Sequence, residues 1–214
     1  MGDECKAGGG TSCDIGAFWD ERYRDEAYAF GTEPNAWFRA CIDELPPGRL
    51  LLPGEGEGRN AVYAARHGWR VDAFDPSPEG RRKAGALAGR HGVTLDFRCC
   101  LLDEYALEAG AYDAVGIIFL HLPPERRRAG YRRLLSALRP GGALIAELYA
   151  KEQLELGTGG PRDLGMLYAL EEVDEDFPGV DFTVRRAIAR DIHEGRLHQG
   201  PSRVIQLFGR RRIS

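Results

Sequence analysis

Three glycines separated by acidic residues form the most informative segment of the chain. Residues 54–60 read Gly-Glu-Gly-Glu-Gly-Arg-Asn, with the glycines at positions 54, 56 and 58. The apolar run Leu50–Leu52 before them predicts a buried strand, and the residues after them predict a helix. Glycine permits a tight turn and lets a ligand approach the backbone, because it has no Cβ atom. In an open parallel sheet such a loop lies outside the carboxyl ends of the strands, where ligands bind.

An acid follows this loop at a spacing typical of ribose-binding residues. Asp75 ends the second predicted strand, 21 residues after Gly54. A carboxylate there can accept hydrogen bonds from both hydroxyls of an adenosine ribose, as in sites for NAD and for S-adenosylmethionine (SAM). The loop and the acid together predict a site for an adenosine-containing cofactor.

The spacing of the glycines favours SAM over a dinucleotide. The dinucleotide fingerprint is G-x-G-x-x-G, and its third glycine admits a pyrophosphate to the helix N-terminus. This chain has G-x-G-x-G, with Arg59 in the place of that third glycine. Glu55 and Glu57 would repel a pyrophosphate, whereas the zwitterionic, sulfonium-bearing tail of SAM tolerates them. No G-K-[ST] follows, which excludes a nucleotide-triphosphate loop.

Four side chains are candidates for contact with an acceptor. His121 follows the fourth predicted strand and, with an ordinary pKa near ~6.5, suits a general base. It could instead cap the helix that begins near Pro123 or bond a backbone carbonyl. Tyr149 ends the fifth strand and could line a pocket or belong to the core. His193 and His198 flank the last turn, as substrate contacts or as residues that stabilise the hairpin.

The elements that must position these residues alternate between strand and helix. Strands are predicted at 50–52, 69–74, 93–97, 112–119 and 143–149, with helices after the first, second and fourth. Such alternation implies a parallel sheet covered by helices on both faces. Residues 167–177 look helical, and strands follow at 180–192 and 203–208. The loop between those two strands is too short for a crossover, so they must pair antiparallel.

At this point the chain resembles the small class I SAM-dependent methyltransferases similar to tellurite-resistance and thiopurine methyltransferases. The resemblance covers about residues 18–211 and is most specific at 55–63, 121–123 and 157–161. Further matching segments are 19–23, 28–35, 193–195 and 198–200. It implies a Rossmann-like α/β fold with a seven-stranded, mostly parallel sheet that ends in an antiparallel pair. It also implies methyl transfer to a small acceptor through an oxygen, sulfur, nitrogen or metalloid atom, with S-adenosylhomocysteine as the product.

The same resemblance assigns roles to individual residues. Gly54, Glu55 and Gly56 would cradle the methionine part of SAM, and Asp75 would hold the ribose. The other expected cofactor contacts are Trp19, Asn60, Ser77, Cys100, Leu101 and Phe119. Two positions depart from the commoner pattern. Leu52 stands where an acid is usual, and Cys100 stands where many relatives carry Asp beside the adenine.

Composition bounds the remaining possibilities. The chain has 214 residues, a net charge of −4 and a pI of about 5.8. These values suit one soluble domain, and they do not favour a nucleic-acid or membrane partner. Arg126–Arg128 is expected to be a solvated helix face. Five unevenly spaced cysteines favour a reducing compartment, so we expect a cytoplasmic protein. A monomer is the default expectation.

No metal site is expected, because neighbouring strand residues such as Cys99 and Cys100 point to opposite faces. Free buried thiols are the better interpretation. The Gly-rich residues 1–14 predict a disordered lead-in without a secretory signal. Residues 15–214 then form one domain, in which 15–45 cap the cofactor site as an aromatic-rich lid. Two other functions stay open: an NAD(P)-dependent oxidoreductase and a SAM-binding protein without catalysis.

Overall fold

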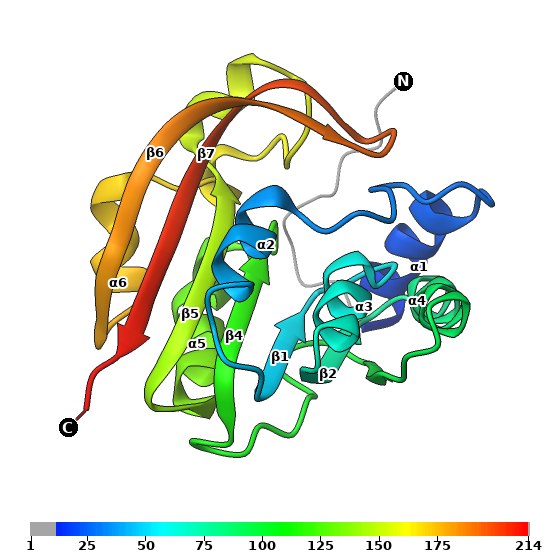
Figure 1. The fold of residues 1–214 in the computed structure, drawn as a ribbon. Coiled ribbons are helices and arrows are strands. Elements are labelled where there is room, and N and C mark those ends of the chain that lie inside the picture. Colours follow the sequence, from blue (N-terminus) through cyan, green and yellow to red (C-terminus); the bar gives the residue numbers. More distant parts are fainter. Residues whose placement is uncertain (1–11, 214) are drawn as a thin grey trace.

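Seven strands form one twisted sheet at the centre of the molecule (Figure 1). The computed structural model describes residues 12–213. The strand order is β3-β2-β1-β4-β5-β7-β6, and neighbours among the first five run parallel. The bounds are β1 Arg49–Pro53, β2 Arg70–Asp75, β3 Asp96–Cys99, β4 Tyr112–Ile118, β5 Leu138–Tyr149, β6 Val180–Glu194 and β7 His198–Arg211. The predicted fold class is confirmed.

Helices cover both faces of this sheet, and each face has its own apolar core. One core joins β1, β4, β5 and β7 to α5 (Pro124–Ala137) and α6 (Val173–Asp176). The other joins β1, β2, β4 and β5 to α2 (Ala36–Ile42) and α3 (Arg59–Arg66). The remaining helices, α1 (Ser12–Tyr23) and α4 (Pro78–Arg90), contact each other. Leu52 is fully buried in the second core, which explains why this position tolerates an apolar residue.

Strand order reverses between β1 and β4. Because β1 pairs with both β2 and β4, successive crossovers leave it in opposite directions. Ligands of open α/β sheets bind at the carboxyl ends of the strands beside such a reversal. Here those ends carry Gly54 and Phe119.

The C-terminal pair is antiparallel, as predicted, and is longer than the sequence pattern indicated. β6 and β7 continue to Glu194 and His198, so the connection is only residues 195–197. Residues 167–177 are less helical than predicted. They contain the short 3-10 helix η3 (Leu170–Glu172) and the four-residue α6. Two other 3-10 helices precede them, η1 (Lys151–Glu155) and η2 (Leu164–Met166).

Two sequence expectations need correction. Arg127 is buried rather than solvated, because it pairs with Asp176 and Glu172 and stacks on Tyr168. The disordered lead-in does not extend to residue 14, since α1 already begins at Ser12; residues 1–11 lie outside the described part. Within residues 12–213, no helix combines the length and apolar character that crossing a membrane requires.

Candidate active site

The glycine loop after β1 has the left-handed backbone that its sequence predicts. The φ angles of Gly54, Gly56 and Gly58 are 62°, 60° and 87°. A Cβ atom at Gly54 would lie 2.9 Å from Leu120, and one at Gly56 would lie 2.6 Å from the hydroxyl of Tyr23. A side chain is therefore excluded at Gly54 and at Gly56 for reasons of both conformation and space.

The carboxylate of Asp75 lies against this loop. Its Oδ2 accepts a hydrogen bond from Gly56 N at 3.0 Å, and its Oδ1 accepts one from Ser77 N at 3.0 Å. Burial raises the pKa of Asp75 to about 7, although the two amides oppose that shift. A carboxylate has about four lone-pair sites, so two stay available to further donors. The loop, the acid and their position at the strand ends fit an adenosine ribose and the amino-acid tail of SAM.

The two acids of the loop do not face a ligand, contrary to the charge argument made from the sequence. Glu55 accepts hydrogen bonds from Asn60 N and Ala61 N, both at 2.8 Å, and so caps the N-terminus of α3. Glu57 forms a 2.6 Å ion pair with Lys83. Both side chains are buried and used within the protein. Glu55 can thus contribute to a cofactor cradle only through its backbone.

Asn60 is also occupied within the protein. Its side chain donates to Glu55 at 3.3 Å and accepts from Asn35 N at 2.9 Å. The residue therefore connects the glycine loop to the N-terminal segment. Its predicted contact with the cofactor stays a prediction.

The N-terminal segment lies on the glycine loop and on the start of α4. Asp20 accepts hydrogen bonds from the Ser77 hydroxyl and from Glu79 N. Trp19 stacks on Tyr23 with ring centroids 5.6 Å apart, and Tyr23 is buried. The segment predicted to be a cap is thus next to the candidate cofactor site.

Lys83 of α4 holds the backbone of this N-terminal segment in place. Its ammonium group donates to the carbonyl oxygens of Tyr23, Asp25 and Ala27 at 2.7–3.1 Å. Lys83 was not predicted from the sequence. A signal existed, because Lys83 lies on the same helix face as the buried Gly80, Ala84 and Leu87.

The residues predicted near the adenosine gather after β2 and β3. Ser77 is the N-cap of α4 and accepts from Gly80 N at 2.9 Å. Cys100 N donates to Asp75 O at 3.1 Å, and both Cys100 and Leu101 are partly buried. The expectation of two buried thiols is wrong for Cys99, which is exposed on the edge strand β3.

Aromatic rings meet beyond the ends of β4 and β5. Phe119 has a positive φ of 52°, which is unusual for a bulky residue and often marks a functional site. Its ring stacks on Tyr149 at 4.5 Å and meets the edge of His198 at 4.8 Å. His198 also lies 4.4 Å from the ring of Phe30. We call Phe30, Phe119, Tyr149 and His198 the aromatic cluster.

A glycine pair closes one side of the aromatic cluster. A Cβ atom at Gly159 would lie 2.6 Å from the Tyr149 hydroxyl, and one at Gly160 would lie 2.8 Å from the Tyr149 ring. Of the predicted acceptor contacts, the structure therefore brings Tyr149 and His198 together beside Phe119.

His121 lies next to the aromatic cluster but is held by backbone groups. Its Nδ1 is 2.9 Å from Met166 O, and its Nε2 is 3.5 Å from Tyr149 N. Burial lowers the pKa of His121 to about 4. These contacts favour the alternative role, a bond to a backbone carbonyl, over that of a general base.

His193 is separate from these residues. It is exposed and faces Gln199 across the hairpin, with Nδ1 3.2 Å from Oε1. The alternation of side chains along β6 and β7 directs His193 and His198 to different environments. The hydrogen bond to Gln199 favours a role in the hairpin for His193.

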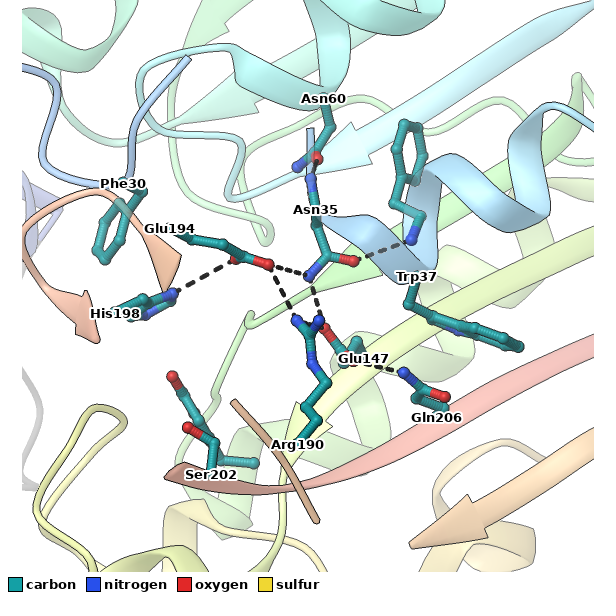
Figure 2. A network of polar contacts seen from close by, with 12 residues as sticks. Phe30, Asn35, Trp37, Asn60, Glu147, Arg190, Glu194, His198, Ser202 and Gln206 are labelled. Carbon is teal, nitrogen blue, oxygen red and sulfur yellow. Dashed lines mark hydrogen bonds and ion pairs between the residues drawn. The ribbon is translucent and has the colours of Figure 1, made fainter. Parts of the chain in front are cut away.

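A buried polar network, shown in Figure 2, lies beside the aromatic cluster. Glu194 pairs with Arg59 at 2.8 Å and with Arg190 at 2.9 Å. Arg190 also pairs with Glu147 at 2.9 Å, and Asn35 donates to both acids. Burial would raise the pKa of Glu194, but His198 and the two arginines hold it at about 2.

Glu147, Arg190 and the pairing of Arg59 were not predicted from the sequence. One signal was present: Glu147 is a charged residue inside the apolar run of β5, and such a residue needs a partner. The partners come from segments that are distant in sequence, so the pairing itself was not readable.

Known proteins that are similar to this chain in sequence are methyltransferases. Residues 51–142 match the family model described as a methyltransferase domain. A thiopurine S-methyltransferase of Pseudomonas putida is 27% identical over 172 residues, covering 68% of this chain and 76% of the relative. Two other curated methyltransferases are matched over only 38% and 47% of their own length, so the chain spans less than half of each.

Solved structures share the fold at low sequence identity. The structure of TehB from Haemophilus influenzae has a TM-score of 0.69 and 14% identity, covering 93% of this chain and 68% of that one. An N-methyltransferase, NodS from Bradyrhizobium japonicum in complex with S-adenosylhomocysteine, also gives 0.69, with 12% identity. That match covers 92% of this chain and 98% of NodS.

Proposed function

We propose that the chain is a class I SAM-dependent methyltransferase that transfers a methyl group from SAM to a small-molecule acceptor. The observation that carries the proposal is the Asp75 carboxylate, which lies 3.0 Å from Gly56 N and keeps lone pairs for further donors. When bound, SAM supplies an electrophilic methyl group on a positively charged sulfur atom.

Residues at the carboxyl ends of the strands would each hold a different part of the cofactor. Asp75 would accept the ribose hydroxyls, and the backbone of Gly54, Glu55 and Gly56 would hold the amino-acid tail. Ser77, Cys100 and Leu101 would lie by the adenosine, and Phe119 would lie by the sulfur. Trp19 would cover the site as part of the cap formed by residues 15–45.

The acceptor would bind near the aromatic cluster. Class I methyl transfer is an in-line displacement, so the protein mainly aligns the acceptor and excludes water. Rings at the ends of β4 and β5 suit this role, because apolar ring faces exclude water from the acceptor. The attacking atom can be oxygen, sulfur, nitrogen or a metalloid. We place the protein in the cytoplasm as a monomer without nucleic-acid or membrane partners, in line with its acidic charge balance.

The experiment is an assay for transfer of a deuterated methyl group. The protein is incubated with deuteriomethyl-SAM and a set of thiols, phenols, amines and oxyanions, and products are detected by mass spectrometry. We expect a labelled product together with equimolar S-adenosylhomocysteine. If S-adenosylhomocysteine binds but no acceptor is labelled, the alternative of a non-catalytic SAM-binding protein is favoured. Tight binding of NADH in its place would favour the oxidoreductase.

A further inference from the structure

A buried polar atom without a hydrogen-bond partner lies in the aromatic cluster. Tyr149 is 1% exposed and His198 is 7% exposed. The Tyr149 hydroxyl has no hydrogen-bond partner among the described residues, and Nδ1 of His198 has none nearer than the 3.8 Å contact with Glu194. The two rings come from the neighbouring strands β5 and β7, and their centroids are 5.6 Å apart. Leaving a buried hydroxyl unpaired is unfavourable, so the Tyr149 hydroxyl beside His198 indicates a use that involves a ligand.

A carboxylate faces one nitrogen of His198. Nδ1 lies 3.8 Å from Oε2 of Glu194. A dashed line in Figure 2 marks this contact. Glu194 is itself held by Arg59 and Arg190, so its position is fixed from two sides. A carboxylate in this position favours a proton on the facing nitrogen and leaves the other nitrogen as an acceptor. Nε2 makes no hydrogen bond to any residue in the described part of the chain.

On the basis of the proposed function, we propose that His198 is the general base that removes the proton of the acceptor. Glu194 acts as its positioning residue, and the Tyr149 hydroxyl binds the acceptor's polar atom. As the acceptor atom forms its bond to the methyl carbon, the carbon–sulfur bond breaks and its electron pair stays on sulfur. The acceptor's proton moves to Nε2 of His198 and then to water.

The charges around His198 define the form of the acceptor. The groups that face it are Glu194 and Arg190 on β6, Arg59 on α3, and Tyr149 and His121 beside the cluster. The negative charges of Glu194 and Glu147 are balanced by the positive charges of Arg190 and Arg59. Burial lowers the pKa of His198, and this keeps the imidazole neutral and able to accept a proton at neutral pH. The site is therefore suited to a neutral, protonated nucleophile and not to an anion.

The test uses 4-nitrophenol, whose anion absorbs at longer wavelength than its neutral form. The protein, saturated with S-adenosylhomocysteine, is titrated with 4-nitrophenol at a pH where the free phenol is mostly protonated. We expect the band of the neutral phenol to shift to longer wavelength, as for a phenol that donates a hydrogen bond to an imidazole, in the wild type and in the control His193→Gln, an exposed histidine of the same hairpin. His198→Gln should lose the shift, and Tyr149→Phe should bind the phenol several-fold more weakly. With SAM, the rate of 4-nitroanisole formation should fall by about 100-fold or more in His198→Gln.

The role of Glu194 as the positioning residue of His198 is tested by a property that would stay unchanged if Glu194 only stabilised the fold. In Glu194→Gln the pH at which the band shift appears should move, and Glu194→Asp should restore it in part. If a variant does not fold, the test uses the NMR resonances of the histidine Cε1–H groups in the wild type, followed during a titration with 4-nitrophenol. His198 should then respond to 4-nitrophenol, and His193 should not.

The outcomes separate this inference from the proposed function. If S-adenosylhomocysteine does not bind the wild type, the proposed function itself fails. If it binds but 4-nitrophenol gives no band shift, or gives the same shift in His198→Gln, the assignment of His198 is overturned.

Discussion

Arg59, in the first turn of α3, forms a 2.8 Å ion pair with Glu194 near the end of β6. Both side chains are about 90% buried, and Arg59 also donates to Phe30 O at 3.2 Å. The pair therefore joins three segments: the helix after the glycine loop, the C-terminal hairpin and the N-terminal cap.

Removal of Arg59 should destabilise the fold strongly. In Arg59→Gln, Glu194 loses one of its two ion-pair partners while it stays buried. Breaking a buried pair from one side typically costs about 3–5 kcal/mol, and we expect a loss near the lower value because Arg190 remains. Urea unfolding measures this loss. The matched control is Arg212→Gln, whose pair with Asp181 is exposed and screened by solvent, so that its loss should lower the stability far less. Equal losses in the two variants would contradict the role of the buried pair.

The glycine loop should not tolerate a methyl group at Gly56. In Gly56→Ala the backbone keeps a φ of 60°, which strains an alanine, and the new Cβ meets the Tyr23 hydroxyl at 2.6 Å. We expect at least a tenfold loss of affinity for S-adenosylhomocysteine in calorimetry, because the loop must shift. Gly85→Ala is the control, since its Cβ would meet nothing within 4 Å in the middle of α4. That variant should bind as the wild type does and gain up to about 1 kcal/mol of stability.

Much of this loop was readable from the sequence because its signals are local. Gly54, Gly56 and Asp75 were identified from spacing within one strand–loop–helix–strand unit. The partners of Glu57 and Glu194 were not, because Lys83 and Arg59 lie on other elements and only the fold brings them close. The two histidines of the hairpin were equivalent in the sequence. Strand register decided that His198 is buried and His193 is exposed.

Stability should depend on pH through Asp75. Its pKa of about 7 in the folded chain exceeds the ordinary value of 3.8. The folded state therefore binds more protons than the unfolded state between about pH 4 and 7, and this contribution to stability is lost as the pH rises through that window. Asp75→Asn cannot lose a proton. Its stability relative to the wild type should thus increase between pH 5 and pH 8 in urea unfolding. A constant difference would show that Asp75 is ionised throughout.

The affinity for the cofactor should rise with pH, whereas the contribution of Asp75 to stability falls with pH. A ribose needs the ionised carboxylate as acceptor, so binding of S-adenosylhomocysteine below about pH 7 must release a proton. Affinity should then fall by up to about tenfold per pH unit as the pH drops from 7 to 5. Calorimetry in buffers of different ionisation enthalpy measures the proton release. Uptake of a proton on binding would be inconsistent with this assignment.

The stability of the N-terminal cap should depend on Lys83. Lys83→Met removes the group that holds three backbone carbonyls of residues 23–27 and leaves Glu57 buried without its cation. We expect a marked drop in melting temperature and faster proteolysis within residues 23–30. Arg82→Gln is the control, because its pair with Glu79 is exposed. Protection of residues 23–30 equal to that of the wild type would argue against an anchor at Lys83.

Calorimetric titration with S-adenosylhomocysteine, next to NADH and NADPH, tests the central claim most directly. Asp75→Ala and the exposed control Asp96→Asn are titrated alongside the wild type. We predict micromolar binding of S-adenosylhomocysteine alone to the wild type and the control, and its loss in Asp75→Ala. Tight binding of NADH without binding of S-adenosylhomocysteine would contradict the account and make this chain an oxidoreductase candidate.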